Sequence, residues 1–247
     1  MIILKNEREQ AAMRVAGAMT AAVLDAVCRF IRPGLTTKEV ELFTAEQIRA
    51  QGGRSAFLGY RGYPCQLCIS VNEEVVHGMA GSRRLQFGDL VSLDVGVSYH
   101  GFIGDTARTV AVGGCSPLAQ KLMDVTERAL EEGIARAVPG NRVVDISRAI
   151  QQYVESNGFS VVREFVGHGV GRTMHEEPQV PNFVDGKKSP PLRPGMTIAI
   201  EPMVNAGKPD VQVLGDGWTA VAKDGSMSAH FEHTVAVTAT GARVLTD

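Results

Sequence analysis

The sequence predicts an α+β fold in which two helices followed by strands occur twice, around a central antiparallel sheet. Three observations predict it: four segments with helical spacing, a Pro-Gly break inside each pair of helices, and strand-like alternation after each pair. No linker-like or low-complexity segment separates the halves. We therefore expect one domain, residues 1–247, with an internal repeat over about 7–112 and 113–247.

The first helical pair is defined by its apolar spacing and by its breaks. Charged and apolar positions recur at helical spacing over 7–31 and stop at Pro33-Gly34. A second helix is predicted over about 37–51, ending near Gly52-Gly53.

The second pair repeats this pattern 106 residues later. Helices are predicted over about 117–137 and 143–157, with breaks at Pro139-Gly140 and Gly158. The same offset aligns Val40 with Ile146 and Ile48 with Val154. An internal duplication explains these matches.

Strands are predicted after each helical pair. Their alternation of apolar and polar residues indicates that most are half-buried and antiparallel. A sheet made by both halves would meet at its middle, where a site could collect side chains from each half. The predicted strands are 68–72, 89–97, 102–112, 160–166, 197–204 and 228–237.

Composition limits the classes of function. The chain has 44% hydrophobic and 21% charged residues and a formal net charge of −2, which gives no electrostatic reason to expect nucleic acid or an anionic membrane as partner. There is no signal-peptide pattern and no uncharged run near the ~18 residues of a membrane span. A soluble cytoplasmic protein is expected. Cys65 and Cys68 form a lone C-x-x-C motif, best explained by reduced, partly buried thiols.

Two aspartates interrupt the apolar pattern of a predicted hairpin, "LDVGVSYHGFIGDTART" at 93–109. A turn centred on Tyr99-His100 would place Asp94 directly opposite Asp105. Directly paired like charges repel. A shared proton or a bound cation would relieve the repulsion.

Three more ionisable groups lie in apolar or glycine-rich segments. His168 stands between two glycines, Glu201 ends an apolar strand before Pro202, and Glu232 lies on a late strand. Taken one at a time, each of these three residues is best interpreted as an ordinary loop residue or a solvated side chain. Together with Asp94 and Asp105 they form an oxygen-rich set that suits two divalent cations better than one structural zinc. Metals ~3.5–4 Å apart need bridging carboxylates, and Asp105 or Glu232 could bridge.

At these residues the sequence resembles type I methionine aminopeptidases, the smallest members of the pita-bread metallohydrolases. The resemblance covers essentially the whole chain and implies the pita-bread fold, in agreement with the duplication. The five segments that carry it are "GYRGYPCQLCISVNEEVVHG" (59–78), the hairpin 93–109, "GHGVGRTMHEEPQVPNF" (167–183), "GMTIAIEPM" (195–203) and "SAHFEHTVAV" (228–237).

The resemblance also implies a function and its residues. It implies two divalent metals (Co, Mn, Fe or Zn) and removal of the N-terminal methionine from nascent proteins whose second residue is small. Glu201 would be the general base, His175 would stabilise the oxyanion, and His77 would bind the amide of the substrate's second residue. The implied ligands are Asp94, Asp105, His168, Glu201 and Glu232, with Asp105 and Glu232 bridging.

A methionine-binding pocket is implied in the same way. Phe57 departs from the pattern of many relatives, which carry cysteine there, and a phenyl ring should narrow the pocket. Transient contact with the ribosome and a monomeric state are further expectations. The implied pocket residues are Phe57, Tyr60, Tyr63, Cys68, His77, Met174, His175 and Trp218.

Three alternatives remain open. Proline-specific peptidases of the same superfamily carry the same five ligands, but they usually add a large N-terminal domain. Type II methionine aminopeptidases carry an inserted helical subdomain between the two motif histidines, whereas six residues separate His168 from His175. A non-catalytic relative would use the fold to bind protein or peptide; such relatives lose ligands, and none is missing here.

Overall fold

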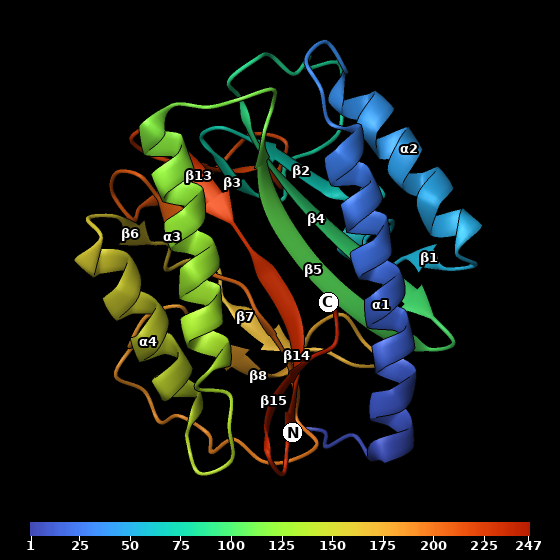
Figure 1. The fold of residues 1–247 in the computed structure, drawn as a ribbon, viewed down its shortest axis with the longest axis vertical. Helices are drawn as coiled ribbons and strands as arrows, with labels where there is room; N and C mark the ends of the chain where they lie inside the picture. The colour runs from blue at the N-terminus through green and yellow to red at the C-terminus, as the bar shows by residue number, and fades with distance from the viewer.

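The computed structural model describes all 247 residues and contains the four expected helices. Figure 1 shows α1 and α2 on one side of the view and α3 and α4 on the other, with the long ribbons of β5 and β14 between them. The observed helices are α1 (Glu7–Phe30), α2 (Thr37–Ala50), α3 (Pro117–Ile134) and α4 (Val143–Ser156), with a short 3₁₀ turn, η1 (Tyr60–Gly62).

Side-chain caps fix where the helices begin. Asn6 accepts a hydrogen bond from the Glu9 N–H at 3.0 Å, and the Glu9 carboxylate accepts one from the Asn6 N–H. Thr36 and Glu39 form the same capping box at the start of α2. α2 and α4 each have 14 residues and start 106 residues apart, at Thr37 and Val143. The limits of the repeat and the single-domain assignment remain predictions.

A nine-stranded sheet forms the centre of the molecule. Its main path runs β1-β4-β5-β14-β9-β7-β8, while β2 pairs with β4 and β15 pairs with β14. The last long strand, β14, thus lies between strands of the two halves. The strands of this sheet are β1 (Arg54–Ser55), β2 (Cys68–Val71), β4 (Leu90–Tyr99), β5 (Phe102–Ala111), β7 (Gly167–Gly169), β8 (Glu176–Val180), β9 (Thr197–Ile200), β14 (Glu232–Thr238) and β15 (Gly241–Val244).

Two smaller sheets complete the strand inventory. One has the order β13-β10-β6 and the other β11-β12-β3. Their strands are β3 (Glu74–Val76), β6 (Ser160–Val161), β10 (Met203–Asn205), β11 (Val211–Val213), β12 (Ala220–Ala222) and β13 (Ser228–His230).

The register predicted for the β4–β5 hairpin is wrong by two residues. Tyr99 pairs with Phe102, so Asp94 lies opposite Ala107, and Gly96 lies opposite Asp105. The turn residues His100 and Gly101 both have positive φ, 47° and 79°, as a two-residue type I′ turn requires, and glycine supplies this at little cost. A two-residue shift keeps every side chain on its face. Asp94 and Asp105 are therefore diagonal neighbours on one face.

Two predicted long strands are each interrupted beside a glutamate. The predicted strand 197–204 is split into β9 and β10 at Glu201-Pro202, and 228–237 is split into β13 and β14 at Phe231. Pro202 has no N–H for a ladder, although its carbonyl still accepts from the Phe231 N–H at 3.4 Å. The predicted strand 160–166 is also shorter, because β6 ends at Val161.

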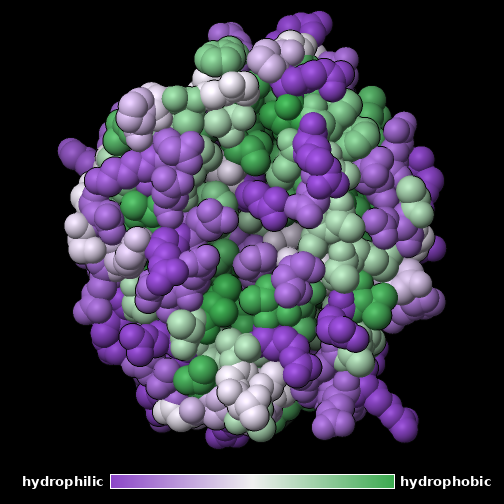
Figure 2. Space-filling model, viewed as in Figure 1, coloured by the Kyte–Doolittle hydropathy of each residue, from purple (hydrophilic) through white to green (hydrophobic).

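α1 is the one helix long and apolar enough, by length and composition, to span a membrane. It packs on β4 and β5, where Gly17 and Gly104 allow close approach: a Cβ on Gly104 would lie 2.7 Å from the Gly17 Cα. Hydrophilic residues cover much of the face that carries the helices, with hydrophobic residues between them (Figure 2). These contacts make α1 a core helix of this fold.

Candidate active site

One pocket of about 160 Å³ contains all thirteen residues that the sequence predicted for the site. It lies where strands from both halves of the chain meet. The remaining lining residues, which sequence reasoning did not single out, are Arg61, Val76, Phe165 and Val166. A larger open groove of about 850 Å³ next to the start of α1 contains none of the predicted residues.

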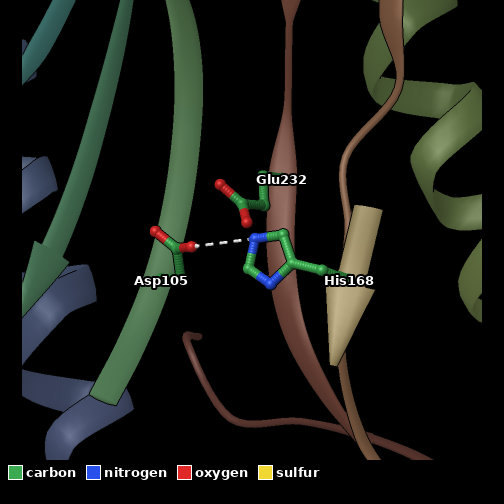
Figure 3. A group of neighbouring side chains, drawn as sticks. All are labelled: Asp105, His168 and Glu232. Atoms are coloured by element: carbon green, nitrogen blue, oxygen red, sulfur yellow. Dashed lines mark ion pairs between the residues drawn. The ribbon is translucent and has the colours of Figure 1, made fainter. Parts of the chain in front are cut away.

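Acidic side chains converge on one imidazole at the polar end of this pocket. Figure 3 shows Asp105 from β5, Glu232 from β14 and His168 from β7 pointing toward one another. Ligand-type atoms of these three lie within 4.8 Å of one another. The Nε2 atom of His168 is 3.7 Å from Asp105 Oδ2 and 3.4 Å from Glu201 Oε1. Asp94, on β4, lines the same pocket.

The ring of His168 is oriented by the backbone. Its Nδ1 lies 2.9 Å from the carbonyl oxygen of Gly169. A carbonyl oxygen only accepts, so Nδ1 carries the proton and Nε2 presents a lone pair to the carboxylates. This backbone-oriented arrangement is typical of metal-binding histidines. The flanking positions have no room for a side chain. A Cβ on Gly167 would lie 2.4 Å from the Ala199 carbonyl oxygen, and one on Gly169 would lie 2.3 Å from the Glu177 carbonyl oxygen.

The carboxyl cluster has buried oxygens without hydrogen-bond partners. They are Asp94 Oδ1, Asp105 Oδ1 and Glu232 Oε1. Burial raises the pKa of Asp94 to about 7. Burial, followed by the neighbouring carboxylates, raises the pKa of Asp105, Glu201 and Glu232 well above the usual range. An acidic cluster of this kind lacks a positive partner.

Divalent cations fit this cluster chemically. Orphaned oxygens and one imidazole lone pair form the donor set that Mn, Fe, Co or Zn accepts. A cation would provide the missing positive charge and the missing partners for the buried oxygens. The residues therefore match a metal centre.

Two further histidines flank the cluster. The Nδ1 of His175 is 2.9 Å from the Tyr60 hydroxyl, and its ring lies 4.2 Å from that of His168 between centroids. His77 packs edge-on against Phe165, at 5.2 Å between centroids. Burial lowers the pKa of His77 to about 4 and also lowers that of His175. Both rings are thus neutral near pH 7.

Aromatic and sulfur-containing side chains form the apolar end of the pocket. Tyr63 packs edge-on against Trp218, with centroids 5.1 Å apart. The Tyr63 hydroxyl donates to the Gly78 carbonyl oxygen at 2.8 Å, so its polar end is satisfied. Phe57 occupies space that Gly96 leaves free, since a Cβ there would lie 2.7 Å from its ring. Cys68 and Met174, both buried, complete this end.

Sequence comparison decides the family. The family model for metallopeptidase family M24 matches residues 11–239. The chain belongs to metallopeptidase family M24. It is 51% identical over 246 residues to a methionine aminopeptidase of Clostridium perfringens, covering 100% of this chain and 99% of the relative. It is 49% identical to methionine aminopeptidase 1 of Bacillus subtilis, with the same coverage.

Solved structures of a methionine aminopeptidase and of a prolidase have the same fold. A methionine aminopeptidase from Thermotoga maritima aligns over 100% of both chains with a TM-score of 0.97 and 46% identity. A prolidase from Pyrococcus furiosus aligns with 99% of this chain and 65% of its own, with a TM-score of 0.82 and 23% identity. The predicted pita-bread fold and the enzyme class, a hydrolase of methionine aminopeptidase type, are confirmed.

One buried histidine of this M24 chain was missed at the sequence level. His230, the last residue of β13, is 2% exposed, and its Nε2 has no hydrogen-bond partner. That atom lies 3.8 Å from Glu201 Oε2. Burial, with a smaller contribution from His77, lowers the pKa of His230 to about 3, so the ring is neutral. Strand alternation could have placed it beside Glu232, but nothing in the sequence links it to Glu201.

Proposed function

We propose that this protein removes the N-terminal methionine from polypeptides whose second residue is small, using two divalent metal ions. The observation that carries the proposal is a single small pocket with a carboxylate–histidine cluster at one end and an aromatic and sulfur-lined recess at the other. The names of its close relatives support the same activity.

Five residues would hold the metals: Asp94, Asp105, His168, Glu201 and Glu232. Asp105 and Glu232 suit a bridging role, because they come from the adjacent strands β5 and β14 and converge with His168. When bound, the cations polarise the scissile carbonyl and lower the pKa of the attacking water.

Glu201 is the proposed general base. It follows the end of β9, and its carboxylate reaches both His168 and His230. A ligand carboxylate with a second oxygen can accept the proton of water as the water attacks the first peptide carbonyl. Asp94, at the polar end, would help to hold the free amino group of the substrate.

His175 and His77 would act on the peptide itself. His175 is a neutral ring beside the cluster, so a hydrogen on Nε2 can be donated to the developing oxyanion while Nδ1 accepts from Tyr60. His77 has a φ of 60°, a strained conformation for a residue other than glycine. This conformation directs its ring into the pocket, where it can bind the amide of the second residue.

The apolar recess would select the methionine side chain. Contacts between a thioether and an aromatic ring contribute roughly 0.3–1.5 kcal/mol each, and Phe57, Tyr63 and Trp218 offer such rings. His77 and His175 leave little room for the next side chain. Ala, Gly or Ser should be accepted there, and Lys or Leu rejected.

The setting of the reaction follows from the substrate. New polypeptides present N-terminal methionine in the cytoplasm at the ribosome, so we place the protein there, with transient ribosome contact and as a monomer. No role in binding specific nucleic acid is proposed, in keeping with the net charge of −2.

The deciding experiment combines metal analysis with peptide turnover. Wild-type protein loaded with Mn, Fe, Co or Zn should bind two equivalents and release methionine from a Met-Ala peptide. A Met-Lys and a Leu-Ala peptide should be poor substrates. Preferential cleavage of an Xaa-Pro dipeptide would point to the proline-specific alternative. Metal binding without turnover of any peptide would point to a binding protein and refute the proposal.

A further inference from the structure

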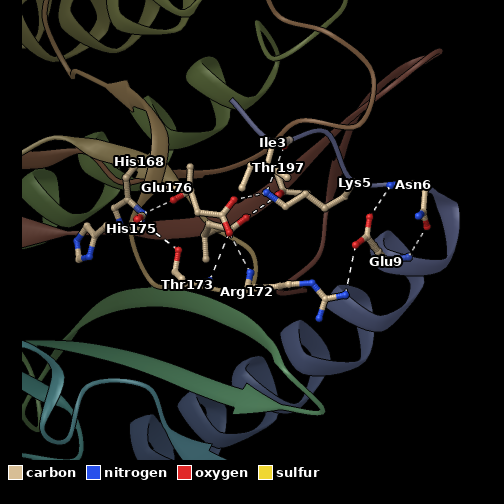
Figure 4. Close-up of polar contacts among 12 residues, drawn as sticks. Ile3, Lys5, Asn6, Glu9, His168, Arg172, Thr173, His175, Glu176 and Thr197 are labelled. Atoms are coloured by element: carbon tan, nitrogen blue, oxygen red, sulfur yellow. Dashed lines mark hydrogen bonds and ion pairs between the residues drawn. The ribbon is translucent and has the colours of Figure 1, made fainter. Parts of the chain in front are cut away.

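A buried ion pair lies behind the segment that carries His175. Lys5 Nζ pairs with the carboxylate of Glu176, and the two side chains are 4% and 5% exposed. The partners are 171 residues apart in sequence. Figure 4 shows Lys5 reaching from the N-terminal segment to Glu176, directly beside His175. Residues 170–175, between β7 and β8, are called the His175 segment below.

The Glu176 carboxylate accepts hydrogen bonds from the backbone of the His175 segment. Its Oε1 accepts from the backbone N–H of Arg172 at 2.9 Å and of Thr173 at 3.3 Å. Its Oε2 pairs with Lys5. The carboxylate thus binds both the backbone before His175 and the N-terminal segment, and it fixes the segment at its base.

Lys5 is itself held in place. Its N–H donates to the Gly195 carbonyl oxygen at 2.7 Å, and its Nζ donates to the Ile3 carbonyl oxygen at 3.3 Å. Gln10 donates to the Lys5 carbonyl oxygen at 2.9 Å. The lysine chain passes so close to Gly171 that a Cβ there would lie 2.5 Å from Lys5 Cε. The glycine at position 171 therefore leaves the room that the Lys5 side chain occupies.

The His175 segment carries two pocket residues, Met174 and His175. On the pocket side, His175 is bound by the Tyr60 hydroxyl. On the opposite side, the Lys5–Glu176 pair restrains the end of the segment next to His175. The start of the segment is held by other contacts: the Val170 N–H donates to the Thr197 carbonyl oxygen at 3.1 Å, and the Gly171 carbonyl oxygen accepts from the Ile103 N–H at 2.9 Å. Removing Lys5 would leave a buried carboxylate without a counter-charge, which is strongly unfavourable. The segment would then have to move to hydrate it.

We propose that the Lys5–Glu176 ion pair is a positioning device that keeps the His175 ring in line with the scissile carbonyl of the substrate. Neither residue touches the substrate, and both act through His175. This inference rests on the proposed function. It makes the first residues of the chain part of the machinery for transition-state stabilisation, because small displacements of such a donor are costly.

A double-mutant cycle tests the proposal. Lys5→Met removes the charge and keeps most of the side-chain volume. We expect kcat for a Met-Ala peptide to fall roughly 10- to 100-fold with little change in KM. In a His175→Ala background, the same substitution should change kcat less than about twofold, because the two residues act as a unit. Equal fold losses in both backgrounds would overturn the proposal.

A second variant separates positioning from stability. Lys5→Met/Glu176→Gln removes both charges, so it should recover the melting temperature that Lys5→Met loses. Its kcat should stay low, because the link between the two segments is still absent. Recovery of kcat together with stability would show a merely structural role and overturn the proposal. Arg128→Met, which breaks an exposed pair on α3, is the matched control and should change neither quantity.

A readout without turnover keeps the inference separate from the proposed function. The chain has six histidines, so the imidazole signals of metal-free protein can be assigned by NMR. The His175 signal should shift in Lys5→Met and not in Arg128→Met. If wild-type protein released no methionine, the proposed function would fail, and an unmoved His175 signal would still refute the positioning role.

Discussion

The two halves of the chain bring carboxylates to the same pocket through different backbone constructions. Asp94 and Asp105 lie within two ten-residue strands, with paired residues on both sides. Glu201 lies one residue beyond β9, and Glu232 is the first residue of β14, after the interruption at Phe231.

In the second half, a side-chain hydrogen bond holds the backbone of each glutamate. The carbonyl oxygen of Glu201 accepts from Asn182 Nδ2 at 3.0 Å, and that of Glu232 accepts from Thr106 Oγ1 at 2.6 Å. The continuous ladder fixes the aspartates as a rigid pair. The interruptions leave Glu201 outside any strand and make Glu232 the first residue of β14, paired with Ala107 of β5, and both carboxylates line the pocket. The comparison teaches that carboxylates can be brought to one pocket by regular or by irregular backbone.

The largest expected effect tests whether one carboxylate from each half bridges the metals. Asp105→Ala and Glu232→Ala should each weaken both sites and lower kcat/KM at least about 10⁴-fold, because Lewis-acid stabilisation of several kcal/mol is lost. His168→Ala should leave one site partly occupied. Calorimetric metal titration and metal-dependent melting measure this. Equal metal affinity in wild type and Asp105→Ala would refute bridging.

The next effect concerns Glu201 alone, the carboxylate placed by an interrupted strand. Glu201→Gln keeps an oxygen ligand but removes the proton acceptor. We expect kcat to fall about 10³-fold, within the range for general bases, with metal stoichiometry unchanged. Steady-state kinetics on a Met-Ala peptide gives the answer. If the variant binds both metals and keeps near wild-type kcat, another group takes the proton.

Protonation of the cluster predicts how metal-free protein responds to pH. Folding raises the pKa of Asp94 to about 7 and that of its three carboxyl neighbours well above normal. The folded state therefore holds more protons than the unfolded chain, and stability falls as pH rises, by about 1.4 kcal/mol per pH unit for each retained proton.

The buried histidines limit the useful pH window. His77, His168 and His230 have lowered pKa values of about 4, 3 and 3, so they increase stability with pH up to about 6.5, their unfolded value. Above that pH, the histidines add no further trend, and the raised pKa values of the carboxyls lower the stability. Burial also raises the pKa of the Cys28, Cys65 and Cys68 thiols, which contribute in the same direction as the pH approaches 8. The melting temperature of metal-free protein should fall between pH 6.5 and 8 and should stay level when metal is added. A flat metal-free profile would contradict the buried cluster.

A smaller expected effect concerns the β4–β5 hairpin, the regular backbone that places the two aspartates. Gly101→Ala places a Cβ at a φ of 79° in the β4–β5 turn and should lower the free energy of unfolding by about 1 kcal/mol. Gly81→Ala is the control, because no atom lies within 4 Å of a Cβ there and φ is not in the left-handed region. Urea unfolding measures both. Equal stability of the two variants would argue against the type I′ turn.

The smallest effect concerns Phe57, in the first half of the chain. Phe57→Cys should widen the recess and reduce the preference for a Met-Ala over a Leu-Ala peptide by about threefold, the magnitude of one lost sulfur–aromatic contact. Competition between the two peptides measures this ratio. Efficient cleavage of the Leu-Ala peptide by wild type would overturn the specificity argument. An unchanged ratio in the variant would show only that Phe57 does not contribute to the selection of methionine.

The sequence was informative wherever periodicity or a breaker residue decides the structure. The four helices end within a few residues of their predicted limits because Pro-Gly and glycine signals are local. The hairpin register was missed because a two-residue shift leaves every face unchanged, and the positive φ of His100 and Gly101 decides between the two.

Features that depend on tertiary contacts could not be predicted. His230 approaches Glu201 because β13 pairs with β10, with His230 opposite Met203, and the Lys5–Glu176 pair joins segments 171 residues apart. Four further residues line the pocket through tertiary placement that no sequence pattern records: Arg61 in η1, Val76 at the end of β3, and Phe165 and Val166 before β7. The thirteen predicted residues line one pocket; chemical type and family resemblance pointed to them, and their roles stay predictions.

The place of β14 in the sheet has a consequence for how the chain folds. β14 pairs with β5 on one side and β9 on the other, although it starts at Glu232, after both of these strands have been made. Until the ribosome has released this segment, β5 and β9 each present an unpaired edge, which invites pairing with other chains. Closure requires contacts of high sequence separation, a property of slow folding. A nascent chain of this protein therefore completes its sheet, and with it its carboxylate cluster, only after β14 has left the ribosome.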